Sequence, residues 1–96
     1  MSRAFVNEDA AAVPEPEFSL PARDSEYYDE AAAWALIQGA DAGYTKEAEL
    51  ATGYQWGEPR LTSEVEGIRD EAEVEDNLRV AQLARRFLRA AERHTR

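Results

Sequence analysis

The most apolar stretch of this 96-residue chain is Ala31-Ala32-Ala33-Trp34-Ala35-Leu36-Ile37. Every position in it is apolar, so a helix built from it has no polar face to turn toward water. Such a helix needs other elements around it, whereas a surface helix carries a single apolar stripe. We therefore predict a central helix over residues 25–38, with the side chain of Trp34 in the core.

The ends of this central helix are predicted from its flanking residues. Asp24 or Ser25 can cap the helix by accepting a hydrogen bond from a first-turn N–H. Gly39 follows the apolar stretch and is of the residue type that most often ends a helix. These signals start the helix after one of the two caps and end it before the glycine.

A short helix and an aromatic loop are predicted next. Thr45 is a suitable N-cap for a helix over 46–52, which a glycine ends. The loop over 53–59 is bracketed by glycines and closed by a proline, so it cannot continue that helix. It carries Tyr54 and Trp56, whose rings either cover the neighbouring helices or anchor a partner protein.

Two further helices are predicted from apolar residues at intervals of three and four. The helix over 59–73 is acidic around its apolar stripe, and the helix over 77–94 is basic on the face opposite its stripe. Residues 75–77 are the predicted turn between them, and so short a turn makes the two helices antiparallel. The stripes consist of Leu61, Val65, Ile68 and Ala72 in the first helix and of Val80, Ala84, Phe87 and Ala91 in the second.

The N-terminal residues predict an extended or flexible arm over 1–23. Pro14, Pro16 and Pro21 each remove a backbone donor and favour extended conformations before them. The larger apolar residues through which this arm would dock are Phe5, Val6, Phe18 and Leu20. The predicted fold is a small all-α bundle of three to four helices over 24–96, preceded by this arm.

Charge is divided unevenly along the chain. The formal net charge is −9, of which residues 1–76 carry −14 and residues 77–96 carry +5. One face of the basic helix repeats polar residues at spacings of 3, 4, 3, 4 and 3, namely Arg79, Gln82, Arg86, Arg89, Arg93 and Arg96. This face is either a solvated surface or a binding site for an acidic partner, and the net negative charge argues against nucleic acid.

The residue inventory argues against catalysis and metal binding. The chain has no cysteine, and its one histidine is His94, so one copy cannot form a catalytic triad, a Cys-His dyad or a histidine-based metal pair. We therefore predict no enzyme activity, no cofactor and no metal. The alternative from this class is a carboxylate-based metal protein or hydrolase, using Glu47 with Glu49 or the acids over 64–76.

The chain lacks the sequence features of export. No apolar run approaches the roughly 18 residues that a membrane span needs, and the N-terminus carries acids where a secretory signal is apolar. We expect no membrane association and a cytoplasmic location. Arginine provides nearly all of the basic residues and alanine is abundant, which is typical of bacterial coding sequences.

The leader resembles that of bacterial Gre-type transcription elongation factors. The residues that carry the resemblance are Met1-Ser2-Arg3-Ala4-Phe5-Val6-Asn7-Glu8-Asp9 and Pro14-Glu15-Pro16-Glu17, together with the similar segment Gly43-Tyr44-Thr45-Lys46-Glu47-Ala48-Glu49. Proteins of that family insert a coiled coil into the secondary channel of RNA polymerase. The resemblance implies a truncated or divergent relative associated with transcription, and it carries no functional residue over to this chain.

Together these features favour a non-enzymatic helical module that binds another protein. The residues predicted to form the binding surface are Arg79, Arg86, Arg89 and Arg93 on the basic helix, and Tyr54 and Trp56 in the loop. Opposed acidic and basic segments also favour a homodimer. The alternatives are a transcription-associated factor that contacts RNA polymerase and an acidic mimic of DNA that inhibits a DNA-binding protein.

Overall fold

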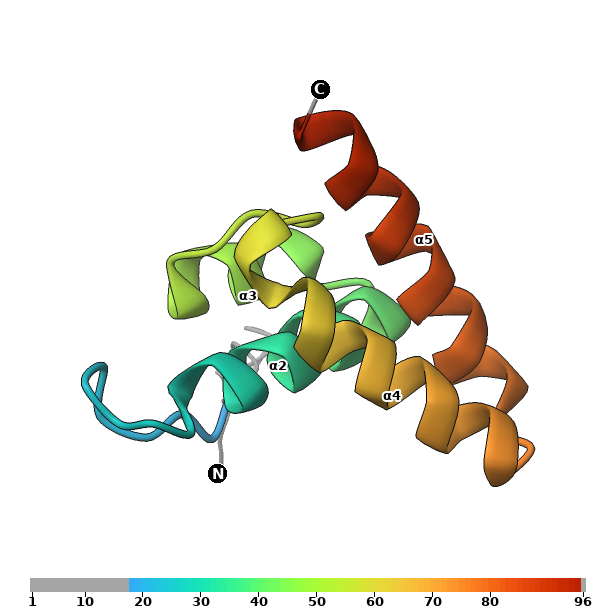
Figure 1. Cartoon of the computed structure of the whole chain (residues 1–96). Coiled ribbons are helices and arrows are strands. Elements are labelled where there is room, and N and C mark those ends of the chain that lie inside the picture. The colour runs from blue at the N-terminus through green and yellow to red at the C-terminus, as the bar shows by residue number, and fades with distance from the viewer. Residues whose placement is uncertain (1–17, 96) are drawn as a thin grey trace, which may run out of the picture.

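The described part of the chain is an all-α bundle, which confirms the predicted fold class (Figure 1). The computed structural model describes residues 18–95. Within them the elements are α2 (Tyr28–Ala42), α3 (Thr45–Thr52), the 3-10 helix η2 (Pro59–Leu61), α4 (Thr62–Val74) and α5 (Leu78–His94). None of these helices combines the length and the apolar character that crossing a bilayer requires.

Helix α2 is the central helix, as its apolar composition predicts. It contacts α3, η2, α4 and α5, and Ala32, Ala33, Leu36 and Ile37 are fully buried. Figure 1 shows α2 crossing behind α4, with α5 running beside α4 at the right of the view. The bundle is therefore built around the stretch that the sequence singles out.

The predicted ends of α2 are wrong. Ser25 does not cap it: the Ser25 hydroxyl accepts from the Tyr27 N–H at 3.1 Å, within a turn that precedes the helix. Gly39 does not end it either, because the helix continues to Ala42 and stops at Gly43, whose φ of 85° is left-handed. Gly39 is buried instead, and a Cβ there would lie 2.8 Å from the Cβ of Ala48.

Gly39 thus serves helix packing. With no side chain at this position, α3 approaches α2 closely enough for Ala48 to be fully buried. The short helix itself differs from its prediction by one residue, since Thr45 is its first residue and Tyr44 precedes it without a side-chain cap. Its predicted stop is confirmed, because Gly53 has a φ of 79°.

Helices α4 and α5 form the predicted antiparallel hairpin. Their apolar stripes are buried, except that Val80 is half-buried, and the stripe of α5 also includes Leu83, which the sequence pattern missed. The turn between them is confirmed: Asp76 has a left-handed φ of 58°, and the Asn77 side chain accepts from the Val80 N–H at 3.3 Å. The predicted opposition of acidic and basic flanks gives an ion pair between Arg85 and Glu73.

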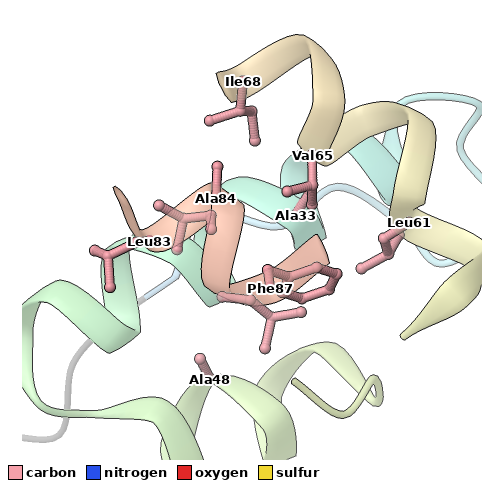
Figure 2. Packing of buried hydrophobic residues seen from close by; sticks show 10 residues of the cluster. Ala33, Ala48, Leu61, Val65, Ile68, Leu83, Ala84 and Phe87 are labelled. Atoms are coloured by element: carbon pink, nitrogen blue, oxygen red, sulfur yellow. The ribbon is translucent and has the colours of Figure 1, made fainter. Parts of the chain in front are cut away.

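The core collects residues from every described helix. Figure 2 shows the ring of Phe87 at its centre, with Leu61 and Ala48 on different sides of the ring. Phe87, Leu61 and Val65 are fully buried. A thin core of this kind makes each large side chain important, because a domain of this size buries a modest part of its surface.

Of the predicted arm, only residues 18–23 belong to the described part of the chain. They form no helix or strand, and Phe18 is half-buried and packs against the core, close to Gly39. Docking through Phe18 is thus as expected. Leu20, another predicted contact, is half-buried but is not among the residues packed against the core cluster. The other two, Phe5 and Val6, lie outside the described range with the rest of the leader over 1–17, as does Arg96.

Candidate functional site

The arginine face of α5 is exposed along its whole described length. Arg79, Arg86, Arg89 and Arg93 lie opposite the buried face of the helix, which is centred on Phe87. Arg79 is paired with Asp41, whose Oδ1 lies 2.8 Å from its Nε. The other three arginines form no ion pair with residues 18–95.

The loop between α3 and η2 is packed against this helix through Trp56 and Gly57. The Trp56 ring is half-buried and meets the Phe87 ring edge-on, with the ring centroids 5.0 Å apart. Gly57 is buried with a φ of 86°, and a Cβ there would lie 2.6 Å from the Cβ of Ala90. Only glycine allows the loop to lie this close to α5.

Glu49 fixes the same loop from α3. Its Oε2 accepts from the Trp56 N–H at 2.7 Å. This contact gives a structural role to a carboxylate that the sequence offered as a catalytic candidate. The one histidine, His94, is exposed in the last turn of α5, at the negative end of the helix dipole.

Tyr54 points to a different part of the bundle from Trp56. Its hydroxyl donates to Asp29 Oδ1 at 2.6 Å, and its ring is tilted against that of Tyr28. The hydrogen bond to Asp29 raises the pKa of Tyr54 above its ordinary value of 10.0, and burial acts in the same direction. Tyr54 therefore covers α2 as a lid, and it is not part of the surface that Trp56 forms.

Trp56 and two of the predicted arginines line one hollow, which we call the basic groove. Its volume is about 330 Å³. It is lined by Ala40, Thr45, Trp56, Arg79, Leu83 and Arg86. The fold thus brings Trp56 together with Arg79 and Arg86, while Arg89 and Arg93 continue the basic face along α5 beyond the groove.

Trp34 is only half-buried, so its predicted core position holds in part. One side of the residue packs against the core, and the other lines a larger hollow between α2 and α4, of about 420 Å³. We call this hollow the acidic groove. Its lining consists of Glu26, Glu30, Trp34, Ser63, Glu64, Gly67, Ile68 and Glu71.

Among the described residues, no lysine, arginine or histidine lines the acidic groove. None of its four glutamates forms an ion pair with residues 18–95, and Glu64 accepts a hydrogen bond from the Ser63 hydroxyl at 3.3 Å. In the same part of the chain, no three acidic or histidine residues are grouped closely enough to hold a metal ion. The four carboxylates are therefore spread along the groove.

Sequence reasoning missed the acidic groove because it depends on how α2 and α4 are rotated against each other. One local signal was present: Gly67 interrupts a helix midway between Glu64 and Glu71, although glycine costs about 1 kcal/mol there relative to alanine. Gly67 is exposed, and a Cβ placed there would meet no atom within 4 Å.

No family model, curated protein or solved structure matches the chain. The relation of the leader to Gre-type factors stays a prediction, since the residues that carry most of it precede the described range.

Proposed function

We propose that this chain is a non-enzymatic protein-interaction module that binds through the basic face of α5 and the basic groove. The observation that supports this most is the meeting of Trp56 with Arg79 and Arg86 in one hollow. The sequence suggested the arginine face and the aromatic loop as separate surfaces, and the fold joins them.

The chemistry of this surface suits an acidic segment with one apolar side chain. Tryptophan and arginine are the residue types most enriched where binding energy concentrates at interfaces. Trp56 and the half-buried or buried apolar residues beside it offer an apolar contact. Arg86 and the arginines beyond it offer cations that form no ion pair with residues 18–95. Arginine also binds carboxylates with two parallel hydrogen bonds, which adds geometric specificity.

The test is an affinity capture with the full chain, followed by titration of each captured protein. Arg86→Glu with Arg89→Glu reverses the exposed face, and we expect it to weaken binding about tenfold or more, equivalent to about 1.4 kcal/mol. The matched control is Arg60→Glu with Arg69→Glu, which makes the same charge change outside α5 and should leave the affinity within about twofold.

The captured protein separates the remaining alternatives. RNA polymerase subunits would support a transcription-associated role, whereas a basic DNA-binding protein whose capture ignores the Arg86 and Arg89 substitutions would support a DNA mimic. Unchanged affinity for every partner in the Arg86 and Arg89 variant would contradict the assignment of the basic face.

A further inference from the structure

The basic face of α5 has a complement on the chain itself. Glu64 and Glu71 stand seven residues apart on α4 and both line the acidic groove. Arg86 and Arg93 stand seven residues apart on α5, and both are exposed. Seven residues are about two helical turns and rise about 10 Å, so the two pairs have the same spacing. Helices laid side by side can bring these charges into register.

The residues between these pairs are also complementary. Gly67 lies between Glu64 and Glu71, and a Cβ there would meet nothing within 4 Å, so the backbone of α4 is open to close approach. Arg89 lies between Arg86 and Arg93 and is exposed. A guanidinium within about 6 Å of an indole face is attracted to it. The arginine opposite the glycine would therefore meet Trp34.

We infer that the acidic groove of one copy receives α5 of a second copy. Arg86 and Arg93 then face Glu64 and Glu71, and Arg89 lies over the indole of Trp34. This inference rests on the proposed function, because it names the partner of the same basic face. The contact joins two different surfaces, so each copy offers one of each and the association is head-to-tail.

A second copy is required because α5 cannot use the acidic groove of its own chain. The opposite face of α5, which includes Ala84 and Phe87, is buried in the core, and no residue of α5 lines the acidic groove of its own chain. The dispersed carboxylates also suit several guanidinium groups better than one compact ion. Exposed ion pairs are individually weak and are screened by salt. The association therefore depends on both concentration and ionic strength.

Sedimentation velocity of the purified full chain tests this at increasing concentration, in about 0.05 M and about 0.5 M salt. We expect the average mass to rise with concentration at low salt and to fall back toward the monomer at high salt. Glu64→Arg with Glu71→Arg should weaken self-association about tenfold or more, and Arg86→Glu with Arg93→Glu should do the same.

Mixing the two charge-reversed variants provides the most stringent test. An equimolar mixture of the two double variants should associate again, since each reversed surface then meets its opposite. The matched control is Glu66→Arg with Asp70→Arg, which places the same charges elsewhere on α4 and should retain association. Gly67→Leu should abolish association without a change of charge, because its side chain fills the groove, and circular dichroism checks that the helices remain.

Three results would overturn the inference: a wild-type chain that stays monomeric at low salt, self-association that survives Glu64→Arg with Glu71→Arg, or a mixture that fails to restore it. Binding of an arginine-rich peptide by a chain that stays monomeric would assign the acidic groove to another protein. A monomeric chain that still loses a foreign acidic partner through Arg86→Glu with Arg89→Glu would leave the proposed function standing and remove only this inference.

Discussion

The two tryptophans lie beside two grooves of opposite charge, and each has a glycine close by. At the basic groove, Trp56 is held edge-on against Phe87, and Gly57 lets the loop touch Ala90. At the acidic groove, Trp34 faces an open hollow, and Gly67 has no neighbour that a Cβ would meet. The first glycine is needed by the fold, whereas the second only keeps a surface open.

Tryptophan and glycine therefore have different roles at the two grooves, and the contacts of each residue determine its role. A tryptophan with an aromatic partner across the core belongs to the fold first and to a binding surface second. Trp34, by contrast, has one side that lines the acidic groove, where the other charged residues of the described chain are four glutamates. Substitutions that disrupt the basic groove should consequently destabilise the fold. Substitutions in the acidic groove should leave the fold intact.

Phe87→Ala should have the largest effect, because it removes both the centre of the core and the partner of Trp56. Phenylalanine to alanine in a core costs about 3–5 kcal/mol. We expect a loss of that size in the free energy of unfolding, measured by urea denaturation. Leu78→Ala is the control, since Leu78 is 74% exposed and should change stability by less than about 0.5 kcal/mol. A loss as small as that of the control would show that Phe87 is not at the centre of the core.

Gly57→Ala should cause the second-largest loss in the free energy of unfolding. The left-handed backbone costs an alanine about 1–2 kcal/mol, and the contact with Ala90 adds to that. Gly43→Ala is a matched control, because Gly43 has a φ of 85° and no atom within 4 Å of a new Cβ. The difference between the two variants in thermal or urea unfolding isolates the packing of the loop on α5. Equal losses would show that the loop is not held there.

Gly67→Ala should have a smaller effect on the free energy of unfolding, and it should stabilise the fold. Alanine is favoured over glycine inside a helix by about 1 kcal/mol, and no neighbour resists the added methyl group. We expect the midpoint of urea unfolding to rise. A fall would mean that Gly67 is needed for folding, and the contrast with Gly57 would disappear.

The smallest predicted effect concerns the other aromatic residue of the loop. The pKa of Tyr54 is raised in the folded chain, so the contribution of its hydrogen bond to Asp29 is complete below pH 10.0 and is lost as the pH rises through the folded value. Tyrosinate absorbance should show one late-titrating group that Tyr54→Phe removes. Tyr27→Phe should leave it, because Tyr27 is 62% exposed. An unchanged late phase in the Tyr54 variant would contradict the contact.

The helices were predictable because their apolar periodicity is local, and the fold class and the buried stripes of α4 and α5 followed from it. The helix ends were less predictable, because Gly39 and Gly43 carry the same local signal. They differ in the fold: Gly39 is buried against Ala48, whereas Gly43 has the left-handed φ of 85° that ends α2. The two grooves could not be predicted from the sequence, although some of their residues could. Trp56 and Arg86 are distant in sequence, and they line one hollow because the loop packs against α5 through Trp56 and Gly57.

The placement of one indole in each groove has an optical consequence. Collisional quenching of fluorescence depends on how often a quencher ion reaches the ring, and a local field of one sign concentrates ions of the other. With Trp56→Phe, the ratio of caesium quenching to iodide quenching of Trp34 emission should exceed that of free tryptophan. With Trp34→Phe, the ratio for Trp56 should fall below it, so fluorescence alone distinguishes the two grooves.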